Sequence, residues 1–435
     1  MELSPKGITS LLNSITDAAL QPQADPTSRR ARLLEAQTIF ESLDQVSIVH
    51  VNVMLKVYYA CADIGGWDFA WRLFERLGPR TKSKTEDEED LGPLGDLIPD
   101  TVTFTMMIKF CAKAKTEAAT KIGLQLWDDI GKLNAQTVTT KKIRLDTQLL
   151  NSMLMIYTHS PNDNVARKGL DFIRHSFGLP LRPEEKVKEL KKRMSVRTLT
   201  LLIQYATRIQ CPDMGLAWFN IIKTKGLKDK YEKLDEGVYN CLSTMMIEAG
   251  QFSKLHQVLE ISPRVPFGIK LRVYATALHT NAPESQKWWE RANEILEKRA
   301  ASLFKFHDIL NYVECGILTG NFRHVASIAL ERQEDVIKWT KGRFEKVLKR
   351  TLENQLAFID YQELGLDVKL LRWIQIAATQ MSLAQNHKNP LPTQPLKALL
   401  LQVQETLGIW ETIESKHKYA KYALRPILRT KVRNH

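Results

Sequence analysis

Residues 51–74 read VNVMLKVYYACADIGGWDFAWRLF. Apolar side chains recur in this stretch every three or four residues, which is the period of an amphipathic α-helix. The period is interrupted at Asp63-Ile64-Gly65-Gly66, and a short glycine-containing turn commonly joins two antiparallel helices. The stretch therefore predicts an αα-hairpin.

The same pattern returns four more times downstream. In each copy a small polar residue opens about ten residues of helical period, and a second helix follows. No alternating run typical of a β-strand is evident in the sequence, so we expect an all-α chain of helical hairpins. The connectors 78–97, 132–144 and 177–194 carry the extra length, because insertions there leave the stacked core intact. The polar residues are Asn52, Thr105, Asn151, Thr200 and Asn240.

An Asp or Ser lies five residues before each of the last four polar residues. These residue types are preferred at helix N-caps, where their oxygens accept hydrogen bonds from the first turn. Capping alone is a sufficient explanation of the pattern, and it stays open beside a role in binding. The four residues are Asp100, Asp146, Ser195 and Asp235.

Two parts of these hairpins resemble the pentatricopeptide repeat. The peptide PDTVTFTMMIK at 99–109 is similar to the boundary between repeats of that family, and NVML at 52–55 with AWRLF at 70–74 is similar to its two helices. The resemblance covers about residues 48–259. It implies a right-handed α-solenoid that binds single-stranded RNA along its concave face, although tetratricopeptide arrays look similar.

The resemblance also implies which side chains would read the RNA. In that family one base contacts the polar residue near the start of the first helix and the last residue of the same repeat. If the base code of that family applies to the matching positions here, the four pairs would read U, G, C and G in turn. Asn240 opens a fifth repeat. The base-reading pairs are Asn52 with Asp100, Thr105 with Asp146, Asn151 with Ser195, and Thr200 with Asp235.

The family usually places an aliphatic residue three positions before the polar one, where it sandwiches bases. Val49 and Val102 conform to this rule, whereas Gln148, Arg197 and Gly237 do not. We therefore expect repeats three to five to bind RNA loosely or to contact protein.

Phosphate groups need cations, and two places in the sequence offer them. One place is eight residues after a polar residue, and the other is a basic tail at 416–435, for which a solvated, frayed terminus is the alternative. The phosphate-contact candidates are Lys113, His159, Arg208, Lys416, Lys418, Lys421, Arg425 and Arg429.

The composition favours a polyanionic partner. The 435 residues hold 62 Lys and Arg against 49 Asp and Glu, which gives a net charge of +13, and the excess lies after residue 100. Nucleic acid suits such a chain, with a merely solvated basic surface as the alternative. The five cysteines lie far apart and form no CxxC pair, which predicts neither a disulfide framework nor a zinc site.

Catalytic signatures are missing from the sequence. It has no P-loop, GxGxxG, HExxH or GxSxG motif, so we expect no enzymatic activity and no metal or cofactor. The acidic run at 86–90 predicts a solvated loop rather than a metal site. No run of 18 apolar residues is present, so no membrane span is expected.

The chain divides into four predicted parts. They are an N-terminal helical segment at 1–47, the repeat array at 48–260, further helices at 261–415 and the basic tail at 416–435. The third part predicts helices at 307–318, 322–331, 334–356, 367–385 and 395–414. Its tryptophans stand at helical spacing and are expected in the core, with base stacking as the alternative. They are Trp288, Trp289, Trp339, Trp373 and Trp410.

Together these features predict a non-catalytic RNA-binding protein of organelles. The family resemblance implies the mitochondrial matrix, although no presequence is evident in the first residues. There the chain would act in RNA stability, processing or translation, with messenger or ribosomal RNA as partner, and association with the mitochondrial ribosome is one variant. The rival is a tetratricopeptide-like scaffold that grips a protein.

Overall fold

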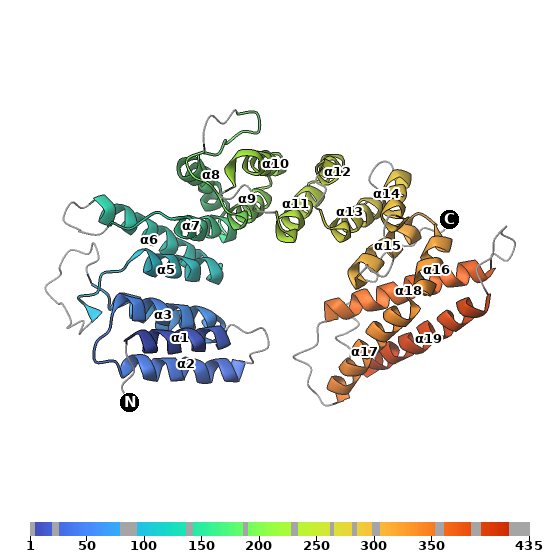
Figure 1. The fold of residues 1–435 in the computed structure, drawn as a ribbon, viewed down its shortest axis with the longest axis horizontal. Coiled ribbons are helices and arrows are strands. Elements are labelled where there is room, and N and C mark those ends of the chain that lie inside the picture. The colour runs from blue at the N-terminus through green and yellow to red at the C-terminus, as the bar shows by residue number, and fades with distance from the viewer. Residues whose placement is uncertain are drawn as a thin grey trace. The chain divides into compact units, whose positions relative to one another are not determined.

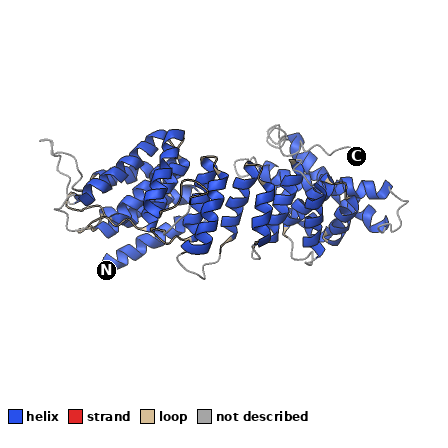
Figure 2. Cartoon of the chain, turned by 90° about the horizontal axis from the view of Figure 1, so that it is seen from above, coloured by secondary structure: helices blue, strands red, loops and turns tan. Residues whose placement is uncertain are grey.

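The computed structural model is almost entirely helical where it describes the chain (Figure 2). Its described part holds nineteen α-helices, and the β-structure within that part is one isolated bridge between Met194 and Leu227. The all-α prediction is confirmed. The described residues are 5–19, 26–78, 94–135, 142–185, 190–227, 234–261, 265–280, 285–297, 305–352, 361–383 and 393–416.

The chain forms two compact units, Met1–Met245 and Met246–His435. The first unit is built from helical pairs in chain order. Its helices are α1 (Pro5–Ala19), α2 (Pro26–Glu41), α3 (Ile48–Ala60), α4 (Gly66–Glu75), α5 (Thr101–Ala114), α6 (Glu117–Ala135), α7 (Thr147–His159), α8 (Asp163–Phe177), α9 (Val196–Arg208) and α10 (Pro212–Ile221), and α11 (Glu236–Glu248) runs across its end.

The first helices of successive pairs pack on one another in the order α1, α3, α5, α7 and α9 (Figure 1). Each second helix packs on its own first helix, as α4 does on α3 and α8 on α7. This stacking of pairs is an α-solenoid, as the sequence predicts. It also brings the start of every first helix to one edge of the stack, because these helices run in the same direction.

The predicted hairpin at 51–74 is confirmed. A single 3₁₀ turn at Ala62–Ile64 joins α3 to α4. Gly65 adopts a φ of 95°, in the left-handed region that favours glycine. Gly66 meets the end of α3 so closely that a Cβ on it would lie 2.2 Å from the carbonyl oxygen of Tyr58. The two glycines therefore make the turn possible.

A second set of glycines lets each second helix approach a first helix closely. A Cβ added to any of them would collide with side chains of a neighbouring first helix. They stand at equal intervals along the chain, a repeat signal that the polar residues alone do not reveal. They are Gly123 against Ile156, Gly169 against Tyr157 and Tyr205, and Gly215 against Met245.

We expect Gly169→Ala to lower the free energy of unfolding by about 1–3 kcal/mol, because the added methyl overpacks a tight contact. The new Cβ would lie 2.8 Å from ring and Cβ atoms of Tyr205 and Tyr157. Gly131 on α6 is exposed and has nothing within 4 Å of its Cβ position. Gly131→Ala should therefore raise stability by about 0.5–1 kcal/mol. Urea unfolding measures both, and two changes of the same sign would contradict the packing argument.

The second unit continues the helical pairs and then departs from them. Its helices α13, α15 and α18 pack in series, while α17 packs on α19 and α18 packs on both α16 and α19. The bounds are α12 (Phe252–Ile261), α13 (Phe267–His279), α14 (Ser285–Glu297), α15 (Phe306–Leu318), α16 (Phe322–Glu331), α17 (Gln333–Leu352), α18 (Tyr361–Leu383) and α19 (Thr393–Lys416).

The helices predicted in this unit are present, with some bounds shifted. The largest shift is in α18, which begins at Tyr361 and runs through Gly365. A glycine weakens a helix by about 1 kcal/mol, which packing in this unit overrides. Four of the five tryptophans are buried, at positions 288, 289, 373 and 410, and Trp339 is half-buried. Their expected place in the core is therefore correct. No helix in the described ranges is both long and apolar enough to cross a membrane.

Candidate nucleic-acid interface

The four Asp and Ser residues before the polar positions all act as caps. Each accepts a hydrogen bond from the backbone N–H three residues later, at 2.8–3.2 Å. The capping explanation is thus correct, and it accounts for the choice of residue type. A cap also fixes where its carboxylate or hydroxyl lies, and the first three caps lie at the edge of the stack where α5, α7 and α9 begin. The four residues are Asp100, Asp146, Ser195 and Asp235.

The first predicted pair is in direct contact. Asn52 Nδ2 donates to Asp100 Oδ1 at 3.0 Å, and Asn52 Oδ1 accepts from Thr103 Oγ1 at 2.8 Å. Asn52 is only 6% exposed. The amide oxygen and one amide N–H of Asn52 are therefore hydrogen-bonded within the protein, and the second N–H remains as a donor. Base reading by this pair stays a prediction.

The two threonines among the polar residues bond to their own helices. Thr105 donates to the carbonyl of Thr101 at 2.7 Å, and Thr200 donates to that of Val196 at 3.1 Å. Each hydroxyl oxygen can still accept a hydrogen bond. In the last two positions Asp235 is exposed and Asn240 is half-buried on α11. The roles predicted for these residues remain predictions.

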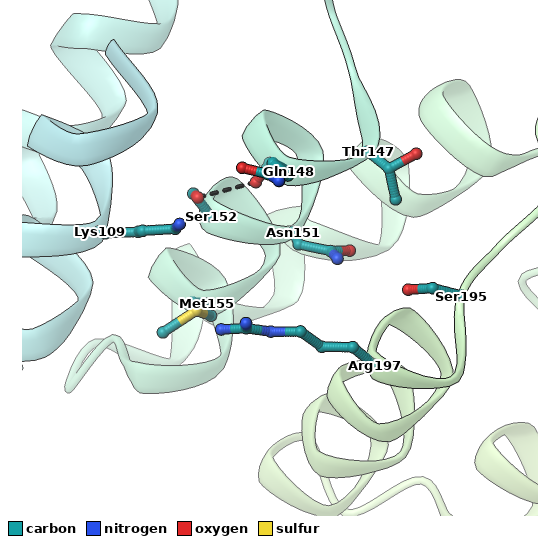
Figure 3. Close-up of a pocket in the computed structure, with 8 residues that line it drawn as sticks. All are labelled: Lys109, Thr147, Gln148, Asn151, Ser152, Met155, Ser195 and Arg197. Atoms are coloured by element: carbon teal, nitrogen blue, oxygen red, sulfur yellow. Dashed lines mark hydrogen bonds between the residues drawn. The ribbon is translucent and has the colours of Figure 1, made fainter. Parts of the chain in front are cut away.

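A hollow of about 310 Å³ lies at the third predicted pair (Figure 3). It opens between α5, α7 and the start of α9, and the side chains of Asn151 and Ser195 point toward each other across it. Its size and half-polar wall suit a small ligand group. Its lining residues are Lys109, Thr147, Gln148, Asn151, Ser152, Met155, Ser195 and Arg197.

Asn151 has a buried acceptor that the protein does not satisfy. The residue is 8% exposed, and its Oδ1 has no hydrogen-bond partner among the residues that the structure describes. A buried polar atom left unpaired costs about 1–3 kcal/mol. Unsatisfied groups of this kind are uncommon in folded proteins. The oxygen is itself closed to solvent, so a donor in the hollow would complement it once the amide turns toward the hollow.

Two cations reach into the same hollow from opposite sides (Figure 3). Lys109 comes from α5 and Arg197 from α9. Neither has an ion pair or hydrogen bond within the described part of the chain. Burial lowers the pKa of Lys109, the nearby charge of Arg197 lowers it further, and the charge of Asp146 offsets part of this effect. The site therefore has more positive charge than the protein neutralises, and an anion would relieve the repulsion.

These two cations are functional candidates that the sequence reasoning missed. Arg197 occupies the position where the repeat family has an aliphatic residue, so it is a visible departure from the pattern. Lys109 lies one helical turn after Thr105, on the same face of α5. Both signals become interpretable only once α5 and α9 are known to flank one hollow.

The two candidate base-sandwiching residues are accessible. Val49 and Val102 are each the second residue of a first helix, α3 and α5, and they are 52% and 44% exposed. Exposed valines in the first helical turn are free to contact a flat apolar surface. Their contact with bases remains a prediction.

The three internal phosphate-contact candidates share a structural role. Each bonds a backbone carbonyl at the end of the preceding first helix, and cations are favourable there because carbonyls are exposed at helix C-termini. The bonds are Lys113 Nζ to Tyr59 O at 3.3 Å, His159 Nδ1 to Ala112 O at 3.1 Å, and Arg208 Nη2 to Ser160 O at 2.9 Å.

These contacts leave little charge for phosphate. Arg208 also pairs with Asp163 at 2.6 Å. Burial lowers the pKa of His159 below its ordinary value of 6.5, so its imidazole is mostly neutral near pH 7. Phosphate contact by these three residues stays a prediction. What their hydrogen bonds do is connect successive first helices.

The remaining candidates fall outside what the structure describes. Lys418, Lys421, Arg425 and Arg429 lie beyond residue 416, and the side chain of Lys416 is not described. The acidic run at 86–90 also lies outside the described residues. Among the residues that are described, no group of three His, Cys, Asp or Glu side chains could hold a metal ion.

Comparison with known proteins gives structural likeness only. No protein-family model matches the chain, and no curated protein is significantly similar to it in sequence. In fold it is similar to the pentatricopeptide repeat protein PPR10 from maize, at 13% identity and a TM-score of 0.40, over 98% of this chain and 56% of that one. It is also similar to PPR10 in complex with an 18-nt psaJ RNA element, at 12% identity and a TM-score of 0.31, over 95% of this chain and 64% of that one. The chain thus spans less than two thirds of these proteins, to which it is similar in its fold of helical repeats.

Proposed function

We propose that the chain binds single-stranded RNA along the first helices of its repeats and carries out no chemistry on it. The observation that carries the proposal is the hollow at Asn151. A buried oxygen with no hydrogen-bond partner among the described residues shares its lining with two cations that form no ion pair with them. The Watson–Crick edge of an unpaired base offers N–H donors, and the RNA backbone offers negative charge. RNA therefore meets both needs of the hollow at once.

A single strand suits the site better than a duplex. In a duplex the Watson–Crick edges are already paired and stacked, so a base cannot enter the hollow at Asn151 as a splayed-out base of a single strand can. The stacked first helices place their caps along one edge, which suits a strand that presents one base after another. The resemblance of the repeat boundary at 99–109 to the pentatricopeptide repeat supports the same function.

The proposed setting is the mitochondrial matrix, because the family that the repeats resemble acts on organellar RNA. There the protein would hold a transcript or ribosomal RNA so that it is stabilised, processed or translated. Association with the mitochondrial ribosome is part of this proposal.

Ultraviolet crosslinking in the native cell extract, followed by sequencing of the attached RNA, tests the proposal. We expect a narrow set of organellar sites with a short core of U, G and C. A variant with Lys109→Glu and Arg197→Glu should lose these crosslinks, because it reverses the charge of the hollow. A control with Arg167→Glu and Lys168→Glu, both exposed on α8, changes the net charge equally and should keep them. Protein partners without RNA above background would contradict the proposal and favour the scaffold.

A further inference from the structure

A second hollow, of about 500 Å³, adjoins the first. The two share Thr147 and Gln148, the first two residues of α7. Three of the residues that line the second hollow are basic, and they come from two different connectors. Its lining residues are Arg144, Leu145, Asp146, Thr147, Gln148, Lys192 and Arg193.

The connector that carries Arg144 is held firmly. Asn134 bonds both backbone groups of Ile143, with its Oδ1 accepting from the N–H at 2.7 Å and its Nδ2 donating to the carbonyl at 3.0 Å. The backbone N–H of Arg144 donates to Thr101 Oγ1 at 3.0 Å. Ile143 itself is buried. The position of Arg144 at the hollow is therefore set by the fold.

The connector that carries Lys192 and Arg193 is also anchored. On one side Lys191 bonds the end of α8, through its N–H to Phe177 O at 3.1 Å and its Nζ to His175 O at 3.0 Å. On the other side Met194 is fully buried. Lys192 Nζ donates to the carbonyl of Leu145, which ties the two connectors together across the hollow.

The charges around this hollow are not balanced by the protein. Arg144 and Arg193 are exposed, and their guanidinium groups have no ion pair or hydrogen bond in the described part of the chain. Asp146 is the single acidic residue of the lining, and it caps α7 through Leu149 N. The N–H groups of the first turn of α7 add partial positive charge at the same place.

We propose that this second hollow is a phosphate subsite for the RNA nucleotide whose base enters the hollow at Asn151. The inference rests on the proposed function, because it assumes that an RNA strand lies across α7. Two observations point to a ligand independently: the unneutralised cations here and the unpaired Asn151 oxygen in the adjoining hollow. The phosphate would lie at the start of α7, where guanidinium groups bind phosphate oxygens in a bidentate manner.

The test compares salt dependence in the full-length chain. The probe is a fluorescein-labelled single-stranded RNA with the sequence UGCG flanked by uridines. The double variant Arg144→Gln, Arg193→Gln should reduce the slope of log K against log salt by about 0.7, the contribution of one single-strand phosphate contact. The double variant Arg167→Gln, Lys168→Gln removes the same charge from α8 and should keep the wild-type slope.

A second measurement locates the phosphate along the strand. A neutral methylphosphonate is placed at one linkage at a time in the same RNA. We expect one position to weaken binding by the wild-type chain and to have little effect on the Arg144→Gln, Arg193→Gln variant, because the two changes remove the same contact.

The outcomes separate the two proposals. If the wild-type chain binds this RNA but the Arg144→Gln, Arg193→Gln variant keeps its slope, the phosphate subsite is wrong and the proposed function stands. An equal fall in slope for the α8 control would also overturn the subsite. The slope would then depend on the total positive charge of the chain and not on a phosphate contact at this hollow. If the wild-type chain does not bind RNA at low salt, the proposed function itself fails.

Discussion

Single-stranded RNA should bind the wild-type chain about twentyfold more weakly when monovalent salt is raised from about 50 to about 200 mM. The expectation follows from three phosphate contacts at the two adjoining hollows, one made jointly by Arg144 and Arg193 and one each by Lys109 and Arg197. At about 0.7 per contact the slope of log K against log salt is about −2.1. Lys192 is left out of this count because its Nζ already bonds the carbonyl of Leu145.

Cations elsewhere on the first helices should add little to this slope. Lys113 and Arg208 bond carbonyls of neighbouring helices, and Arg208 also has a carboxylate partner. A cation that already has a partner releases fewer RNA counterions when it reaches a phosphate. Arg208→Gln should therefore change the slope less than Arg197→Gln does.

Fluorescence anisotropy at four or more salt concentrations measures the slope. A peptide groove would show a much flatter dependence, because its contacts are mainly apolar and short-range. A slope near zero, together with binding of an extended peptide, would contradict the RNA proposal and favour the protein scaffold.

The helical pairs could be predicted from the sequence because their signals are local. In residues 51–74 the period of apolar residues and the Gly65-Gly66 turn both act within a few residues of the chain, and the structure matches them. The caps follow for the same reason, since Asp100 bonds an N–H only three residues away. Such signals can be read from a few neighbouring residues, while packing supplies most of the stability of each helix.

The difference between the repeats could not be predicted in this way. Asn52 and Asn151 hold equivalent places in the sequence pattern, yet the amide of Asn52 bonds Thr103 and Asp100 while the oxygen of Asn151 has no partner. The donor to the Asn52 oxygen is the hydroxyl of Thr103. The equivalent hydroxyl in the later repeat, that of Thr198, instead lies in hydrogen-bond contact with Ser195 Oγ at 3.1 Å.

The cations also show that spacing along the sequence does not determine what surrounds a side chain in the fold. Counting eight residues from each polar position selects Lys113, His159 and Arg208, whose side chains join successive helices. Lys109 and Arg197 lie at other positions in their helices and meet at one hollow. Only the packing of α5, α7 and α9 brings them together, so no period along the chain could identify the pair.

Asn151→Leu should weaken RNA binding about tenfold to a hundredfold without lowering stability. Leucine has a similar size but cannot accept a hydrogen bond, so a base donor in the hollow would lose its partner at a cost of about 1–3 kcal/mol. The free energy of unfolding should stay the same or rise, because the variant removes a buried oxygen that is unpaired in the free protein. Anisotropy and urea unfolding measure the two effects.

Asn52→Leu is the matched control, since it makes the same change at the equivalent position of the first repeat. It removes the bonds to Asp100 and Thr103, so we expect the free energy of unfolding to fall by about 1–3 kcal/mol. The two variants should thus separate stability from binding, as polar groups kept for function tend to do. If Asn151→Leu destabilises the protein as much as Asn52→Leu, Asn151 has a structural role. If it binds RNA as the wild type does, no base is read in the hollow at α7.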